Sequence, residues 1–267
     1  MKVFAVIGYP IKHSLSPDMF NAVFKHLGIE AVYLKLEVKP ENLKEAIFGA
    51  KALGFSGLNV TIPLKERVLE FVKPVKLAKK IGAVNTVKLD TMEGFNTDAF
   101  GVVKSLEDHG VEFDGKFLVI GAGGAARAAV FSLVEKGGEV YVTNRTEEKG
   151  VKLAREADCN FIRKEDLQKE RFDVIINATP LGMVGMENSL PVGEEVIKRA
   201  SVVFDMVYNP AETLLIKKAK TLRKEVIYGY EMLLYQAYEA FKIWNGFYPP
   251  VEVMRGALLK KLGFYHE

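Results

Sequence analysis

A glycine-rich turn constrains the fold of this chain more than any other feature of its sequence. The residues Gly121-Ala122-Gly123-Gly124-Ala125-Ala126 fit the pattern Gly-x-Gly-x-x-Gly/Ala and directly follow the apolar strand expected at Phe117–Ile120. The spacing predicts a helix from the turn to about Lys136 and a second strand at Glu139–Thr143. This order of strand, turn, helix and strand is typical of a dinucleotide-binding unit of the Rossmann type.

Three positions of the turn have a physical reason to be small. Gly121 permits the tight turn, Gly123 lacks the Cβ that would keep a pyrophosphate from the backbone, and Ala126 lets the helix pack against the strand. The N-terminus of the helix then offers free N–H groups and the positive end of its dipole to the phosphates. A glycine-rich turn that only packs a helix on a sheet is the alternative, and the flanking strands favour the cofactor. The expected cofactor contacts are Gly121, Ala122, Gly123, Gly124 and Ala125.

The end of the second strand favours NADP(H) over NAD(H). A site for NAD usually has an acidic residue about 20 positions on, where it binds the ribose 2′-hydroxyl. Here Thr143-Asn144-Arg145-Thr146 occupies that place, and the planar guanidinium of Arg145 suits a 2′-phosphate. Lys149 adds a second cation about one helical turn later. Thr146 is expected to cap a helix that starts with two glutamates, although a carboxylate this close still allows contact with a ribose.

Strands and helices alternate on both sides of this unit, which predicts an α/β protein with mainly parallel sheets. The other expected strands are Val3–Gly8, Val32–Val38, Gly57–Ile62, Val174–Asn177 and Val202–Asp205, with a hairpin formed by Val84–Leu89 and the segment near Phe95. The other expected helices are Ser16–Leu27, Pro40–Leu53, one from about Leu64, Asp98–His109, Glu231–Trp244 and Val251–Leu262. We expect an N-terminal open α/β sheet domain (1–103), a Rossmann domain (104–230) and C-terminal helices (231–267) that return to the first domain.

The charge balance, the cysteine count and the length of the apolar runs limit which kinds of partner and compartment we expect. The 37 basic and 34 acidic side chains leave a net charge of only +3, so we expect no broad basic field for nucleic acid. The single cysteine, Cys159, forms neither an internal disulfide nor a cysteine-rich metal site, which favours a reducing compartment. No apolar run approaches the roughly 18 residues that a membrane span needs. We therefore expect a cytoplasmic protein with a small-molecule substrate and with no metal, nucleic-acid or membrane partner, for which a homodimer is an allowed assembly.

Two charged residues outside the glycine turn are candidates for catalysis. Lys65 follows the strand Gly57–Ile62, at the carboxyl end where open α/β sheets bind ligands. In the first turn of the expected helix its charge opposes the helix dipole, which favours the neutral amine that acid–base chemistry needs. Asp98 opens another helix, where it or Thr97 would be a natural N-cap. The functional alternative is a carboxylate that faces Lys65 across a cleft.

Other polar residues have weaker signals. Ser14 and Ser16 follow the first strand and suit a polyhydroxylated ligand, although Ser16 before Pro17 also resembles an N-cap. Tyr238 and Lys242 have the spacing of a short-chain dehydrogenase pair, but their distance from the glycine turn favours a packed helix. We expect His109, near a helix end, to be solvated.

Together these segments resemble the shikimate dehydrogenase family over nearly the whole chain. The resemblance is carried by His13-Ser14-Leu15-Ser16-Pro17, Asn59–Lys65, Gly82–Thr86, Asn96-Thr97-Asp98, Gly121–Ala125, Asn144-Arg145-Thr146, Asn177–Met183, Gly229 and Gln236. It implies reversible, NADPH-dependent reduction of 3-dehydroshikimate to shikimate in aromatic amino-acid biosynthesis. Lys65 would be the general acid and base, and Asp98 its partner.

The resemblance also assigns binding residues. For the substrate it implies Ser14, Ser16, Thr61, Asn85, Asp98, Gln236 and, as a further candidate, Tyr208. For the cofactor it implies the glycine turn with Asn144, Arg145, Thr146 and Lys149, and near the nicotinamide Met206 and Gly229. Lys149 stands where many members have arginine, so it keeps the charge but not the planar fork. Phe20 stands where the family often has histidine, and we expect it to face packing.

Three other functions remain as alternatives. A quinate dehydrogenase, or an enzyme that uses both substrates, is the nearest; Ser14 together with Arg145 favours shikimate. A non-catalytic NADP-binding sensor would need only the Rossmann unit, and Lys65 with Asp98 argues against it. A methylene-tetrahydrofolate dehydrogenase would be expected to stack its flat pterin on aromatic rings rather than on so many hydroxyl groups.

Overall fold

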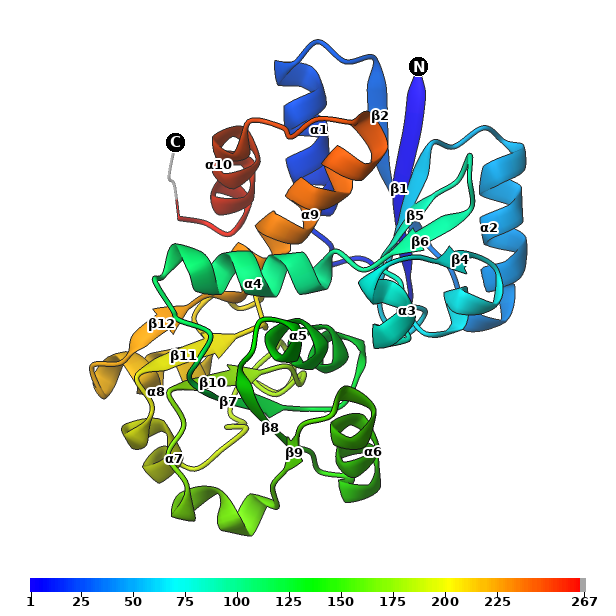
Figure 1. The fold of residues 1–267 in the computed structure, drawn as a ribbon. Coiled ribbons are helices and arrows are strands. Elements are labelled where there is room, and N and C mark those ends of the chain that lie inside the picture. Colours follow the sequence, from blue (N-terminus) through cyan, green and yellow to red (C-terminus); the bar gives the residue numbers. More distant parts are fainter. Residues whose placement is uncertain (265–267) are drawn as a thin grey trace. The chain divides into compact units, whose positions relative to one another are not determined.

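The computed structural model describes residues 1–264 and forms two compact units (Figure 1). The first comprises residues 1–100 together with the chain from residue 234 onward, and the second comprises residues 101–233. The chain passes between the units within two helices, α4 (Asp98–Asp108) and α9 (Gly229–Asn245). Each unit has its own six-stranded sheet, so the predicted α/β class with two domains is confirmed.

The sheet of the first unit is mixed. Its strands are β1 (Lys2–Gly8), β2 (Ala31–Glu37), β3 (Gly57–Val60), β4 (Lys73–Pro74), β5 (Thr86–Lys88) and β6 (Glu93–Phe95), in the order β2-β1-β3-β5-β6-β4. β1 is parallel to β2 and β3, whereas β5 is antiparallel to both β3 and β6. The hairpin expected near Phe95 is therefore confirmed. Its first strand, β5, is the strand that runs antiparallel to its neighbours.

The C-terminal helices belong to the first unit, as predicted. Its helices are α1 (Ser16–His26), α2 (Leu43–Ala52), α3 (Leu77–Ile81), the later part of α9 and α10 (Val251–Lys261), with short 3-10 turns at Pro40–Asn42 and Arg67–Glu70. α10 packs against α1, and Trp244 of α9 donates from Nε1 to the carbonyl of Val87 at 3.0 Å. Phe20 is fully buried and stacks on Tyr33 with ring centroids 4.3 Å apart, so the expectation that it faces packing is confirmed.

The helix expected from Leu64 is absent. Residues 62–66 form turns and a bend, and the next helix is the short 3-10 helix. The backbone N–H of Leu64 bonds back to Thr61 at 2.9 Å, and the carbonyl of Lys65 accepts from the N–H of Val84 at 2.8 Å. The carbonyl of Lys65 therefore bonds to the segment just before β5 and not within a helix. Because Lys65 is not in the first turn of a helix, no helix dipole opposes its charge, and that part of the prediction was wrong.

The second unit has the parallel, doubly wound sheet predicted from the glycine turn. Its strands are β7 (Lys116–Ile120), β8 (Glu139–Thr143), β9 (Asn160–Phe161), β10 (Val174–Asn177), β11 (Val202–Asp205) and β12 (Glu225–Ile227), in the order β12-β11-β10-β7-β8-β9. Its helices, besides the start of α9, are most of α4, α5 (Gly124–Glu135), α6 (Glu147–Ala157), α7 (Glu194–Arg199) and α8 (Leu214–Thr221), with a 3-10 helix at Lys164–Lys169. The strand order reverses direction at β7, where such folds bind a dinucleotide.

The register aligns the carboxyl ends of the central strands. Ile120 of β7 lies opposite Thr143 on one side and Asn177 on the other, and Asn177 lies opposite Asp205 of β11. Polar residues that end separate apolar strands thus meet at one edge of the sheet. Among residues 1–264, no helix combines the length and the apolar character needed to cross a bilayer.

Candidate active site and cofactor site

Lys65 and Asp98 form an ion pair in the first unit. Lys65 lies in the turn after β3, and its Nζ is 2.6 Å from Oδ2 of Asp98, the first residue of α4. The side chain of Lys65 is 16% exposed and that of Asp98 is 5% exposed. The ammonium is thus accessible to a small ligand while its counter-ion is almost enclosed by protein, an arrangement that suits proton transfer at a defined place.

We expected Thr97 or Asp98 to cap helix α4 with its side chain, but in the structure Asn96 does so instead. Asn96 is the side-chain acceptor for the first turn, since its Oδ1 accepts from the N–H of Ala99 at 3.3 Å, and its Nδ2 donates to the carbonyl of Ala83 at 3.0 Å. Both carboxylate oxygens of Asp98 bind side chains instead: Oδ2 binds Lys65, and Oδ1 accepts from Nδ2 of Asn85 at 2.8 Å.

Asn85 links this ion pair to a buried polar network. The Nδ2 of Asn59 donates to the carbonyl of Asn85 at 3.0 Å and to Oγ1 of Thr86 at 2.9 Å. The phenol of Tyr33 in turn donates to Oδ1 of Asn59 at 2.6 Å. Burial raises the pKa of Tyr33 well above its usual value, against an opposing hydrogen bond with Ser16, so the phenol stays a donor. A continuous chain of bonds therefore runs from Tyr33 to Lys65.

Tyr33 and Asn59 were not among the residues predicted for the site. Tyr33 lies on an alternating strand, where an aromatic residue normally indicates core. Asn59 carries a usable signal, because it is a polar residue inside β3, all four residues of which are buried. In the described part of the chain no buried side-chain nitrogen or oxygen lacks a hydrogen-bond partner, so the network is fully satisfied.

The other predicted substrate residues of the first unit lie near strand ends or on α9. Ser14 is half-buried, and its Oγ accepts from the N–H of Ser16 at 3.4 Å. Ser16 is buried as the first residue of α1, whose N-cap is Leu15, so it is not the N-cap that its sequence suggested. Thr61 is half-buried directly after β3, and Gln236 is buried on α9.

The glycine turn of the second unit has the geometry that its sequence predicted. Gly121 has a φ of 121°, and a Cβ there would lie 3.0 Å from the carbonyl oxygen of Ala178. A Cβ on Gly123 would meet nothing within 4 Å, and α5 begins at the next residue. Ala126 is fully buried, as close helix packing requires. The N-terminus of α5 is therefore open to a phosphate group.

The end of β8 presents two exposed cations, Arg145 and Lys149. Within residues 1–264 neither side chain takes part in an ion pair, whereas Oε2 of the nearby Glu147 lies 3.5 Å from Nε of Arg163. Thr146 is the N-cap of α6 but accepts no capping bond through its side chain, and Nδ2 of Asn144 donates to its carbonyl at 2.8 Å. The carboxylate of Glu147 thus lies beside Arg163 rather than Arg145, and the exposed guanidinium of Arg145 suits a 2′-phosphate.

Met206, Tyr208 and Gly229 lie together in the second unit. Met206 and Tyr208 are half-buried in the loop that follows β11. A Cβ on the buried Gly229 would lie 2.6 Å from the carbonyl oxygen of Met206 and 2.5 Å from that of Val207. Only glycine allows this loop to approach the start of α9 so closely.

Asp205 is a further residue that the sequence prediction missed. It ends β11 and is fully buried, and burial raises the pKa of its carboxyl group to about 6 although Thr213, Val207 and Asn177 hydrogen-bond to it. A carboxylate at the end of the apolar run 202–205 was the available signal.

Three other residues considered from the sequence, Tyr238, Lys242 and His109, have other partners. Lys242 donates to the hydroxyl of Tyr248 at 2.9 Å, and Tyr238 stacks on the same ring, which agrees with a packed helix. His109 is not simply solvated as expected, because its ring nitrogens lie 2.8 Å and 2.9 Å from carboxylates of Glu225 and Glu231. Burial opposes the charged ring, but these hydrogen bonds outweigh it and raise the pKa of His109. Among the residues described, no group of three or more histidine, cysteine or acidic side chains could hold a metal ion.

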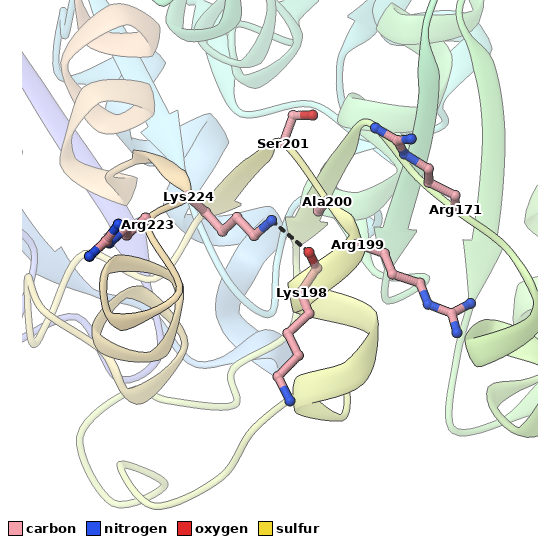
Figure 2. A pocket seen from close by; sticks show the side chains of 7 residues that line it. All are labelled: Arg171, Lys198, Arg199, Ala200, Ser201, Arg223 and Lys224. Atoms are coloured by element: carbon pink, nitrogen blue, oxygen red, sulfur yellow. Dashed lines mark hydrogen bonds between the residues drawn. The ribbon is translucent and has the colours of Figure 1, made fainter.

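A basic cavity of about 400 Å³ lies at the opposite edge of the second sheet (Figure 2). It is lined by Arg171, Lys198, Arg199, Ala200, Ser201, Arg223 and Lys224, which precede strands β10, β11 and β12. Figure 2 shows the guanidinium groups of Arg199 and Arg223 pointing to opposite sides, and Nζ of Lys224 donates to the carbonyl of Lys198 at 2.6 Å. The charges do not converge, and the amino ends of parallel strands are not where such sheets bind ligands.

Known families match consecutive parts of this chain. The shikimate dehydrogenase substrate binding domain matches residues 6–87, the shikimate / quinate 5-dehydrogenase family matches residues 106–210, and the shikimate 5'-dehydrogenase C-terminal domain matches residues 229–259. The first match contains Lys65 and Asn85, and the second contains the glycine turn and Arg145.

Full-length relatives agree with these matches. The shikimate dehydrogenase (NADP(+)) of Archaeoglobus fulgidus is 52% identical over 272 residues, covering 99% of this chain and 100% of the relative. A crystal structure of a shikimate dehydrogenase in complex with NADP+ has a TM-score of 0.92 at 42% identity, covering 98% of this chain and 96% of that one. The enzyme of Thermus thermophilus, in complex with NADP(H) and shikimate, has a TM-score of 0.91 at 35% identity, covering 97% and 99%. This chain belongs to the shikimate dehydrogenase family.

Proposed function

We propose that this protein is an NADP-dependent shikimate dehydrogenase, which catalyses the reversible reduction of 3-dehydroshikimate to shikimate. The observation that carries the proposal is the ion pair of Lys65 and Asp98, whose Nζ–Oδ2 distance is 2.6 Å. A chain that only sensed NADP would not need an accessible ammonium held by a buried carboxylate in the unit without the glycine turn. The family membership and the open helix N-terminus of α5 support the same function.

Lys65 is the general acid in reduction. Its ammonium donates a proton to the oxygen of the substrate ketone as that oxygen becomes an alkoxide, and in oxidation the neutral amine removes the proton from the hydroxyl. NADPH, when bound, supplies the hydride. Asp98 holds Nζ in place through Oδ2, while Asn85 fixes the other carboxylate oxygen at 2.8 Å. Asp98 thereby orients the proton donor, and we assign it a hydrogen bond from a substrate hydroxyl to a remaining lone pair of its carboxylate.

The remaining polar groups would bind the hydroxyls and carboxylate of the substrate. We assign this role to Ser14, Ser16, Thr61, Asn85, Gln236 and Tyr208. Short hydroxyl and amide side chains both donate and accept, which suits a small polyhydroxylated ring. Asn85 connects this set of groups to the network that runs from Tyr33 to Lys65.

The second unit would hold the cofactor. The open N-terminus of α5 suits the pyrophosphate, with the residues Gly121, Ala122, Gly123, Gly124 and Ala125 around it. Asn144, Arg145, Thr146 and Lys149 would surround the 2′-phosphate, with Arg145 as the bidentate donor. Met206 and Gly229 would border the nicotinamide.

We further propose residues 1–103 as the substrate domain, 104–230 as the NADP domain and 231–267 as helices that complete the first domain. A cytoplasmic location and a homodimer are part of the same proposal. The location rests on the single cysteine Cys159, which indicates a reducing compartment.

The test is a spectrophotometric assay of the purified protein with shikimate or quinate as substrate and NADP+ or NAD+ as oxidant. We expect the highest kcat/KM with shikimate and NADP+. Absence of activity with that pair would refute the proposal, and higher kcat/KM with quinate would make the protein a quinate dehydrogenase.

A further inference from the structure

The carboxylate of Asp205 is the centre of a buried polar cluster in the second unit. Its Oδ1 accepts from Nδ2 of Asn177 at 2.9 Å and from the N–H of Val207 at 3.0 Å, and its Oδ2 accepts from Oγ1 of Thr213 at 2.5 Å. Asp205 is fully buried, so water does not compete for these bonds.

The three donors come from three separate segments. Asn177 ends β10 and also fixes the loop after it, because its Nδ2 donates to the carbonyl of Leu181 at 3.1 Å and its Oδ1 accepts from Oγ1 of Thr179 at 2.6 Å. Val207 belongs to the loop after β11. Thr213 is the N-cap of α8, where its Oγ1 accepts from the N–H of Ile216 at 3.2 Å.

Two of these segments border the expected cofactor site. The loop after β10 approaches the glycine turn so closely that a Cβ on Gly121 would lie 3.0 Å from the carbonyl oxygen of Ala178. The loop after β11 contains Met206, and its backbone packs on Gly229. The carboxylate of Asp205 therefore joins the loop beside the glycine turn to the loop expected beside the nicotinamide. It does so next to a backbone bond from the N–H of Met206 to the carbonyl of Asn177 at 3.0 Å.

We propose that Asp205 is a positioning residue for NADP(H), which fixes the loops after β10 and β11 relative to each other without touching the cofactor. This inference rests on the proposed function, since it assumes that these loops border the cofactor. Three converging donors require an acceptor with several lone pairs, which a carboxylate has. Alanine at this position would remove the acceptor of the Val207 N–H, the Thr213 hydroxyl and one N–H of the Asn177 amide, so the loops would move to find other partners.

The test measures the Kd of NADP+ by fluorescence titration of the intact protein and its Asp205→Ala and Asp205→Asn variants, at a temperature where circular dichroism shows each to be folded. We expect Asp205→Ala to raise Kd about tenfold, the effect of one unmet buried hydrogen bond. Asp205→Asn retains one acceptor oxygen for Asn177 and Val207, so we expect it to recover most of the affinity. Asp173→Ala is the matched control, because Oδ2 of Asp173 accepts from the N–H of Lys116 at 2.8 Å at the other edge of the same sheet.

An unchanged Kd in folded Asp205→Ala would overturn the proposal, and so would an equal loss in Asp173→Ala, which would indicate general loosening. If Asp205→Ala does not fold, Thr213→Val decides, since it removes the donor to Oδ2 of Asp205 together with the side-chain cap of α8: a raised Kd supports the proposal and an unchanged Kd refutes it. The wild-type protein is measured first with NADP+ alone. Failure of the wild type to bind NADP+, or to oxidise shikimate, would count against the proposed function and is thus distinguishable from failure of this inference.

Discussion

Replacing Asp205 by asparagine should change how the stability of the protein depends on pH. Burial raises the pKa of Asp205 from 3.8 to about 6, so the folded state holds a proton there more tightly than the unfolded state does. The stability that the protonated form contributes is fully present below the unfolded pKa near 3.8, and it is lost as the pH rises through about 6. The free energy difference over that interval is about 3 kcal/mol.

Asparagine keeps the size of the side chain and does not titrate in this range. The wild-type protein should therefore lose about 3 kcal/mol of stability relative to Asp205→Asn between about pH 4 and pH 7, with no further relative change at higher pH. A difference of that size corresponds to roughly 6–12 °C in Tm for a protein of this length. Differential scanning calorimetry of both proteins at a series of pH values would measure it.

Comparison of the two proteins at each pH removes the contribution of other titrating groups. His109 is the main one in this range, because its two glutamate partners raise its pKa; its contribution is present at low pH and is lost as the pH rises. Both proteins contain that histidine, so its effect cancels. A Tm difference that stays constant from pH 4 to pH 7 would show that Asp205 has an ordinary pKa, and the buried carboxylate argument would be wrong.

Three further predictions test other parts of the molecule. Lys65→Ala should lower kcat by about 10²–10⁴ with a much smaller change in substrate Kd, measured by steady-state kinetics and titration; a large loss of binding with little change in kcat would make Lys65 a substrate anchor. Arg145→Ala should raise the KM of NADP+ far more than that of NAD+, and equal effects would remove Arg145 from the phosphate site. Gly57→Ala should lower the free energy of unfolding by about 1–3 kcal/mol in a denaturant titration, because the new Cβ would lie 2.3 Å from Nε1 of Trp244; an unchanged midpoint would contradict that close contact.

The parts of the fold that the sequence predicted are those with local signals. The apolar run Phe117–Ile120 and the glycines after it specify a strand and a turn without reference to the rest of the chain. Strands β9 and β12 were missed because they have only two and three residues, and their pairing with β8 and β11 stabilises them rather than an apolar run of their own. The helix expected after Leu64 failed for a related reason, since the backbone of Lys65 bonds to a segment about twenty residues away.

The candidate site was predictable in part. Residues that follow strands on the ligand side of a parallel sheet come together, and this rule made Lys65 a candidate. For Asp98 the sequence left two alternatives open, an N-cap or a carboxylate that faces Lys65, and the ion pair supports the second. The rule says nothing about Tyr33, which reaches Asn59 from β2, two strands away from β3 in the order of the sheet. It also gave no reason to prefer Asp205 over other polar residues, because the raised pKa of its carboxyl group depends on burial by three segments that are distant in the chain.

Two helix starts in the first unit show why local interpretations of polar residues can hide functional ones. Asp98 and Ser16 both suit the N-cap role in sequence, which would occupy their side chains with backbone N–H groups. In the structure Asn96 serves the first turn of α4, and Leu15 is the N-cap of α1 without any side-chain bond. The carboxylate of Asp98 is therefore available to Lys65, and the hydroxyl of Ser16 is available to Tyr33. At Asp98 the distinction between a capping residue and a site residue depends on whether a neighbour can satisfy the helix, and Asn96, two residues before it, was the visible sign that one could.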